Sequence, residues 1–373
     1  MDRTTCLLIL FWFSTCNAIS ASLPPDSVNR DISPGINLYW GYLQYHHQEM
    51  KILQEAPARA LELSLSTRGD GSRLWHSFYC NPKYGISYKL MDLGSQSILG
   101  YAHCFFPFIE IPITQQSSSF EIDFRAGAGI GYMRKVYNPQ TNHQNSAIST
   151  HINAYIDLGL LARVRVAKNT WVTGGAHLIH FSNGSLQKPN YGLNYTLVSL
   201  GLVYKKLEPN LNKKGQYAYS QEKSRLLVTG ATSRKEAVGI GGPRFWVASS
   251  QLEYSIPVVT PLFRVGVSLD FMYDKSNSLI LDNSNIHWDS DWETAKLGAA
   301  ISTEFILEKT SLVLNFGGYY HNLSRSISNQ WVYQRIALRY RFTQRLWAHI
   351  ALKTHWNIAD YLEVGIAYKV FGK

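Results

Sequence analysis

Hydrophobic and polar residues alternate with a period of two over most of the chain, from residue 35 to the C-terminus. In the stretch FEIDFRAGAGIGY, residues 120–132, the even positions are apolar and the odd positions carry charges or glycine. Successive side chains of a strand point to opposite faces, so this stretch has one apolar and one polar face. Helical periodicity is rare by comparison. The pattern predicts an all-β protein.

The long charged faces favour a membrane barrel over a soluble β-sandwich. The stretches LFRVGVSLDFMY (262–273) and VYQRIALRYRF (332–342) also place Arg or Asp on one face, opposite aliphatic and aromatic residues. In a membrane barrel the apolar face contacts lipid and the polar face lines the interior. Tyr and Trp are enriched at the headgroup level of membranes, and this chain has 23 Tyr and 10 Trp. We therefore expect an antiparallel, multi-pass transmembrane β-barrel of the cell outer membrane.

The number of alternating segments sets the size of the expected barrel. Sixteen segments fall between residues 35 and 371, and bacterial single-chain barrels have an even number of strands. We expect one barrel of about 14–16 strands, with residues 21–206 and 222–373 on either side of a connection, 207–221. Because that connection is long for a periplasmic turn, the alternative is an eight-stranded barrel followed by a second barrel unit.

The first residues are typical of a secretory signal. The apolar stretch CLLILFWFSTCNAISA follows Arg3 and ends in small residues, so residues 1–20 are predicted to be a signal peptide. No later segment has the roughly 18 to 20 uninterrupted apolar residues of a spanning helix. Two cysteines remain after removal of the signal, Cys80 and Cys104, and their pairing stays open.

The charge balance indicates anionic partners. The chain has 36 Lys and Arg against 26 Asp and Glu, for a formal net charge of +10. Behind a signal peptide we expect no nucleic acid, which leaves anionic lipid or polysaccharide. The histidines, His46 and His47 among them, lack acidic or Cys partners at metal-ligand spacing. We expect no cofactor and no metal, and homodimerisation stays open.

The string HFSNGSLQKPNYGLN, residues 180–194, carries the candidate chemistry. His180 and Ser182 fall on the apolar face of one strand, and Asn194 falls on the same face of the next strand, so the three can converge at the lipid side. A hydroxyl, an imidazole and a group that orients the imidazole are what acyl transfer needs. The alternative is a solvated strand end that contains the same residue types without catalysis.

The same string resembles the lipid A 3-O-deacylase family of outer-membrane barrels (PagL-like), also described as acyloxyacyl hydrolases. The family pattern is His, one residue, Ser-Asn, then Asn-x-Gly before a polar residue that begins the next strand. The similarity covers residues 35–206, and the C-terminal strands lie outside the short barrel of the best-known members. By that resemblance Ser182 would be the nucleophile, His180 the general base and Asn190 the oxyanion-hole residue.

The resemblance implies an outer-membrane serine esterase that removes an ester-linked (hydroxy)acyl chain from lipid A of lipopolysaccharide. Asn194 stands where the family carries a Glu that orients the histidine. An Asn can accept the imidazole N–H but brings no charge, so we expect weaker activation of the base or an acid from another strand or loop. The positive charges in and near this hairpin have two equally good explanations: partners of lipid A phosphates, or solvated loop charges. They belong to Lys188, Arg134 and Lys135.

The alternative function is a noncatalytic barrel, either a pore or a scaffold, derived from such an enzyme. Polar interior positions such as Arg264, Asp270, Arg335 and Arg339 fit a channel as well as a salt-bridged lumen.

Overall fold

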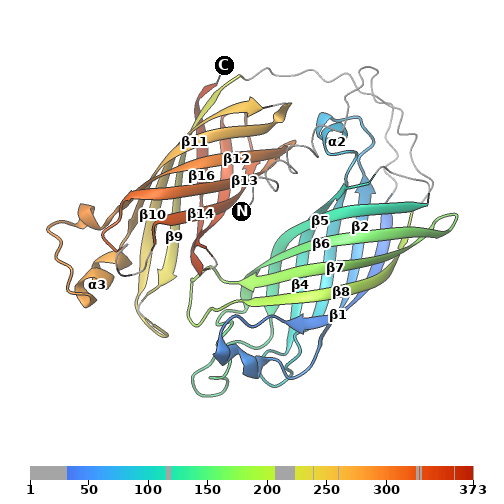
Figure 1. Cartoon of the computed structure of the whole chain (residues 1–373), viewed down its shortest axis with the longest axis horizontal. Helices are drawn as coiled ribbons and strands as arrows, with labels where there is room; N and C mark the ends of the chain where they lie inside the picture. The colour runs from blue at the N-terminus through green and yellow to red at the C-terminus, as the bar shows by residue number, and fades with distance from the viewer. Residues whose placement is uncertain are drawn as a thin grey trace. The chain divides into compact units, whose positions relative to one another are not determined.

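The computed structural model describes residues 32–114, 119–205, 223–237, 239–258, 260–324, 327, 330–356 and 358–372. These residues form sixteen strands in two closed barrels of eight strands each (Figure 1). The predicted signal peptide 1–20 and the predicted connection 207–221 lie outside the described residues.

The first barrel closes through hydrogen bonding between its first and last strands. Leu38 of β1 lies opposite Leu200 of β8 in this antiparallel pair. A 3-10 helix, η1 (Gln48–Leu53), lies between β1 and β2, and a short helix, α2 (Leu74–Phe78), lies between β2 and β3. The strands are β1 (Ser33–Leu43), β2 (Ala58–Arg68), β3 (Lys83–Asp92), β4 (Tyr101–Pro112), β5 (Phe120–Met133), β6 (Ile152–Ala167), β7 (Thr170–Ser182) and β8 (Leu193–Tyr204).

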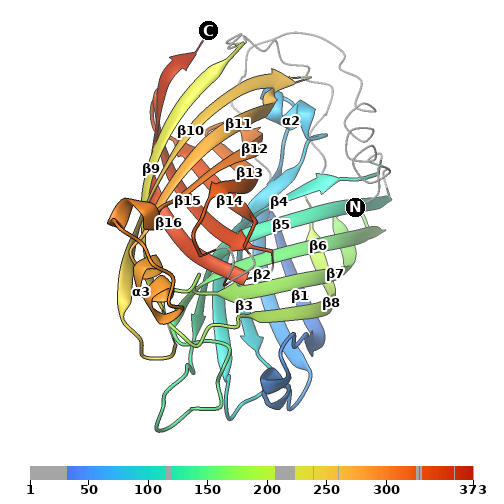
Figure 2. The same cartoon turned by 60° about the vertical axis from the view of Figure 1, so that its left-hand side comes forward.

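The second barrel closes in the same way, because β16 pairs with β9 as well as with β15 (Figure 2). Helix α3 (Ser276–Asn283) and the 3-10 helix η2 (Asp291–Thr294) lie in the connection between β11 and β12. The strands are β9 (Arg225–Glu236), β10 (Arg244–Val258), β11 (Thr260–Asp274), β12 (Lys296–Leu307), β13 (Thr310–His321), β14 (Val332–Arg341), β15 (Leu346–His355) and β16 (Ile358–Gly372).

The all-β barrel class predicted from the sequence is confirmed, but the preference for one large barrel is wrong. β8 pairs with β1, and β16 pairs with β9, so the chain closes two sheets of eight strands. This is the alternative of two barrel units. Alternation within a strand reports only which side chains point inward, and it is the same in a barrel of eight strands and in one of sixteen. The pairing partner of the eighth strand decides between them.

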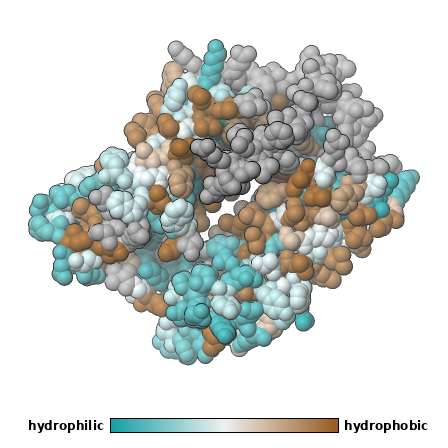
Figure 3. Space-filling view, viewed as in Figure 1, coloured by the Kyte–Doolittle hydropathy of each residue, from teal (hydrophilic) through white to brown (hydrophobic). Residues whose placement is uncertain are grey.

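Apolar side chains cover the outside of both barrels. In β8 the exposed side chains of Val198, Leu200 and Leu202 alternate with inward-facing ones such as Leu197 and Ser199. Figure 3 shows hydrophobic residues gathered over the strands of the first barrel and hydrophilic residues at the end that carries η1. Among the described residues, no helix is long and apolar enough to cross a membrane.

Paired charges fill the inside of the first barrel. The buried Glu62 carboxylate accepts hydrogen bonds from Arg125 Nη2 at 2.6 Å and from Ser87 Oγ at 2.9 Å. Beside it, Lys89 Nζ donates to Asp157 Oδ2 at 2.7 Å. An eight-stranded barrel is just narrow enough for side chains to fill. Buried charges in such a space must be paired, and here they are.

The second barrel has the same kind of interior. Arg339 Nη2 donates to Glu253 Oε2 at 2.9 Å, and Arg335 Nε lies 2.8 Å from Glu363 Oε1. All four side chains are almost completely buried. These interior charges are therefore packed against one another, as in a salt-bridged lumen rather than an open channel at these residues.

The two cysteines of the predicted mature chain do not pair with each other. Cys104 lies in β4 with its side chain buried, and its thiol is free. The question that the sequence left open is thereby answered: there is no bridge between Cys80 and Cys104.

We expect Glu62→Gln to lower the free energy of unfolding by about 3–5 kcal/mol, because it leaves the buried Arg125 guanidinium without its closest carboxylate. Urea titration of the protein in phospholipid vesicles, followed by tryptophan fluorescence, measures this change. Glu49→Gln is the matched control, since Glu49 is exposed in η1 and its neutralisation should change stability by no more than about 0.5 kcal/mol. Equal effects of the two variants would contradict this account of the interior.

Candidate active site

The hairpin of β7 and β8 brings His180 and Asn194 together. The two residues lie directly opposite each other in the antiparallel pair. Ile179 and Phe181 are buried on the inner face of β7, so alternation assigns His180 and Ser182 to the outer face with the exposed Leu178. His180 is half-buried there, and Ser182 is buried, at 4% exposure. The structure thus gives His180, Ser182 and Asn194 the common outward face that the alternation predicts.

The imidazole of His180 is held in one tautomer. Its Nδ1 lies 2.6 Å from the Oδ1 atom of Asn194. Because a carbonyl oxygen can only accept, Nδ1 carries the proton and Nε2 has the free lone pair. No carboxylate is bonded to His180 among the described residues, so the acid that the sequence analysis left open is absent from its hydrogen-bond partners. The ring is oriented by an amide alone.

Two donors converge on the hydroxyl of Ser182. Asn190 Nδ2 donates to Ser182 Oγ at 2.9 Å, and the backbone N–H of Gly184 donates to the same oxygen at 3.1 Å. The other end of the Asn190 amide is also used, since its Oδ1 accepts the N–H of Asn183 at 3.1 Å. The orientation of this amide is therefore determined at both ends. Gly184 N–H is a donor that the sequence analysis missed, because it depends on the local turn.

The β7–β8 loop is fixed by a side-chain network that the sequence analysis also missed. Asn183 Nδ2 donates to Gln187 O at 2.9 Å and to Ser149 Oγ at 3.1 Å. Ser149, in the connection between β5 and β6, donates in turn to Gln187 O at 2.8 Å. These contacts hold the segment that carries Asn190. The sequence does not predict these hydrogen bonds, because Ser149 is distant from the loop in the chain.

Gly192 lies against the catalytic candidate His180. A Cβ atom on Gly192 would stand 3.1 Å from His180 Cε1 and 3.0 Å from Phe181 O. The backbone of Gly192 has a φ of 77°, in the region that favours glycine. The glycine of the Asn-x-Gly motif therefore makes room for the imidazole and allows the chain to turn into β8.

Some of the predicted neighbours do not contact one another. Among the described residues, the His180 imidazole and the Ser182 hydroxyl are not hydrogen bonded to each other, since the hydroxyl accepts from Asn190 and Gly184 instead. Bonds of this kind often form only when substrate is present.

Lys135 Nζ donates to the carbonyls of Gln96 and Ser97 at 2.9 and 2.8 Å, so it is engaged within the loops.

Comparison with protein families identifies the relationship. Residues 60–203 match the family model described as lipid A 3-O-deacylase (PagL), and residues 224–373 match the one described as the C-terminal domain of acyloxyacyl hydrolase. The chain belongs to the PagL lipid A 3-O-deacylase family. The family predicted from residues 180–194 is confirmed, and the second match adds the C-terminal strands that the resemblance did not cover.

Membership of this family supports ester hydrolysis on lipid A as the general activity, and it agrees with two β-barrels of the cell outer membrane. No curated protein matches the chain. Solved outer-membrane barrels also match over most of this chain, with low identity and low TM-scores. They include Omp33 of Acinetobacter baumannii (7% identity, 92% of this chain and 100% of that chain, TM-score 0.19). The siderophore receptor PirA of Pseudomonas aeruginosa is another (8% identity, 93% of this chain and 82% of that chain, TM-score 0.23).

A second serine and histidine occur together inside the first barrel. His177 Nδ1 lies 2.9 Å from Asp157 Oδ1, and His177 Nε2 lies 3.1 Å from Ser199 Oγ. The three residues have the partners of a Ser-His-Asp triad, but all are buried. A Cβ on Gly175 would come within 3.0 Å of Ser199 Oγ and 2.5 Å of Leu161 Cδ2, so this space is already full. This interior cluster has no room for an ester next to its serine.

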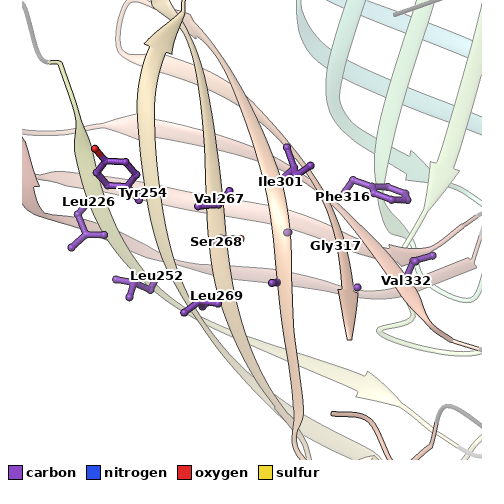
Figure 4. A pocket seen from close by; sticks show the side chains of 13 residues that line it. Leu226, Leu252, Tyr254, Val267, Ser268, Leu269, Ile301, Phe316, Gly317 and Val332 are labelled. Carbon is purple, nitrogen blue, oxygen red and sulfur yellow. The ribbon is translucent and has the colours of Figure 1, made fainter. Parts of the chain in front are cut away.

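A hollow of about 510 Å³ on the second barrel is lined mainly by apolar side chains (Figure 4). Exposed side chains such as Val267, Leu269 and Ile301 place it on the outer, lipid-facing surface. Its lining contains one serine, Ser268, and no histidine or acidic residue. It therefore offers no base to a nucleophile. Among the described residues, no group of His, Cys, Asp and Glu is arranged to hold a metal ion.

We expect Gly192→Ala to reduce acyl release from lipid A by roughly 10²-fold, because its Cβ displaces the imidazole of His180. Initial rates measured with the refolded protein test this expectation. Gly174→Ala is the matched control: Gly174 lies on the outer face of β7, and a Cβ there would meet only Ser199 O, at 3.7 Å. A Gly192→Ala protein that is as active as Gly174→Ala would show that the close approach is unimportant.

Proposed function

We propose that this protein is a serine esterase that removes an ester-linked (hydroxy)acyl chain from lipid A, with Ser182 as nucleophile and His180 as general base. The observation that carries the proposal is the convergence of Asn190 Nδ2 and Gly184 N–H on Ser182 Oγ, next to a histidine whose Nε2 lone pair is free. Asn194 orients the imidazole, and Asn190 belongs to the oxyanion hole.

The reaction begins when His180 Nε2 takes the proton of the Ser182 hydroxyl and Oγ attacks the ester carbonyl carbon. The carbonyl oxygen becomes an oxyanion close to Oγ, where Asn190 Nδ2 and Gly184 N–H can donate to it. Collapse of this intermediate breaks the ester C–O bond, and the proton on Nε2 passes to the leaving hydroxyl of lipid A. Water, deprotonated by His180, then attacks the acyl-enzyme, releases the fatty acid and restores Ser182.

The replacement of a carboxylate by Asn194 affects this reaction in one respect. Proton transfer to Nε2 creates an imidazolium, which a neighbouring carboxylate would stabilise by charge and an amide cannot. The tautomer is nevertheless correct, because Asn194 Oδ1 accepts the Nδ1 proton. In serine proteases the asparagine variant of the acid is most damaging because it stabilises the wrong tautomer. We therefore propose a working but slower esterase.

The outward face of β7 suits a membrane-embedded substrate. His180 and Ser182 lie at the end of the strand, beyond the exposed apolar residues Ala176 and Leu178. A polar pair near the headgroup level is far less costly than one at the bilayer centre. The acyl chains of lipid A can stay in hydrocarbon while the ester reaches the serine.

We expect Ser182→Ala and His180→Ala to abolish acyl release, since the first removes the nucleophile and the second removes its base. Mass spectrometry of lipid A after incubation with each refolded protein detects the loss of one hydroxyacyl mass.

Ser199→Ala and His177→Ala are the matched controls, because these residues form the sealed cluster inside the barrel. Folded Ser199→Ala should keep the wild-type product. If Ser182→Ala still deacylated lipid A and Ser199→Ala did not, the site on the β7–β8 hairpin would be the wrong one. If the wild type left lipid A unchanged, the noncatalytic scaffold would be the better account.

We expect Asn190→Ala to lower kcat by about 10²–10³-fold with little change in KM, because the lost donor acts on the oxyanion rather than on the ground state. Steady-state rates with lipid A in detergent micelles separate the two constants. A rise in KM with an unchanged kcat would assign Asn190 to substrate binding instead of the oxyanion hole.

A further inference from the structure

His46 lies next to the amide of Asn194, although the two residues are far apart in the sequence. Its Nδ1 is 3.4 Å from Asn194 Nδ2, on the side of the amide that faces away from His180. The backbone supports this approach: Gln44 N–H donates to Asn194 O at 2.7 Å, and Leu43 pairs with Tyr195. Closure of the barrel between β1 and β8 therefore places His46 at the site.

An asparagine can serve His180 in one orientation only. A rotation of 180° about its terminal torsion exchanges the carbonyl oxygen with the NH₂ group, and the two have nearly the same size. With the NH₂ group toward His180, Nδ1 would have to accept, and the ring proton would move to Nε2. The imidazole would then have no lone pair for Ser182. A carboxylate has no such ambiguity, because either oxygen accepts.

We propose that His46 is a positioning residue that keeps Asn194 Oδ1 directed at His180. In this arrangement His46 carries its ring proton on Nε2, so its Nδ1 lone pair accepts an N–H of the Asn194 amide; with that tautomer the productive orientation is the one in which both ends of the amide are bonded. The proposal rests on the proposed esterase function and explains how this chain works with an amide where the family has Glu. His46 does not touch substrate, and it acts through Asn194 on the tautomer of His180.

The test compares His46→Ala in two backgrounds of the full chain. In the native background we expect kcat for acyl release to fall roughly 3- to 10-fold with KM unchanged, the effect of one modest hydrogen bond. In the Asn194→Asp background, which is isosteric, both side-chain oxygens accept, and His46→Ala should have no effect. Glu49→Ala is the control from the neighbouring η1, where Glu49 is exposed, and we expect it to keep the native rate.

A purely structural role of His46 would give a different pattern. If His46→Ala lowered kcat equally in both backgrounds, His46 would only support the loop, and the proposal would be overturned. An unchanged rate in the native background would also overturn it. Ser182→Ala is measured in the same assay. If Ser182→Ala keeps the native rate, the proposed esterase function is wrong. If Ser182→Ala is inactive and His46→Ala keeps the native rate, only the proposed role of His46 is wrong.

The tautomer can be observed directly, which keeps the test decisive even if Asn194→Asp is inactive. The measurement is an NMR spectrum of ¹⁵N-histidine-labelled protein in detergent micelles. When the His180 ring is neutral, its Nδ1 should be protonated and its Nε2 unprotonated. We expect His46→Ala to shift the His180 signals toward a mixture of tautomers, while Glu49→Ala leaves them unchanged. Identical His180 signals in wild type and His46→Ala would rule out the proposed positioning.

Discussion

Hydrogen bonding between β1 and β8 is the constraint on which the rest of the first barrel depends. An open sheet edge in hydrocarbon would leave backbone groups without partners, so the sheet must close. Closure after eight strands leaves an interior that side chains fill, and Glu62 and Arg125 pair there. The same closure brings His46, in the connection that follows β1, beside Asn194. Interior and candidate site both follow from one strand pairing.

The site combines an uncharged orienting group with well-placed donors. Asn190 and Gly184 bond the Ser182 hydroxyl, and Asn194 bonds His180. The Asn194 amide cannot stabilise the imidazolium by charge. It can still hold His180 in the tautomer whose Nε2 atom is a base. On a membrane-facing surface an uncharged group also has a smaller desolvation cost than a carboxylate.

The first barrel contains two serine–histidine pairs, one inside the barrel and one on the β7–β8 hairpin. Ser199, His177 and Asp157 are in direct contact, yet the space beside them is occupied. They form part of the paired interior that also contains Lys89. Ser182 has no such bond to its histidine, but it projects outward on a strand whose other face is buried. The face of the strand distinguishes the two clusters, since both serines are buried but Ser199 points into the filled interior and Ser182 lies on the outer face of β7.

The sequence by itself determined the elements and the face on which each side chain lies, because strand alternation is a local property of the chain. It also indicated the family, since His180, Ser182 and Asn190 occur within one hairpin. Only the tertiary structure decided that the sheet closes twice, that Cys104 stays a free thiol, and that His46 meets Asn194. Each of these depends on which distant segments pair, and alternation carries no information about pairing partners.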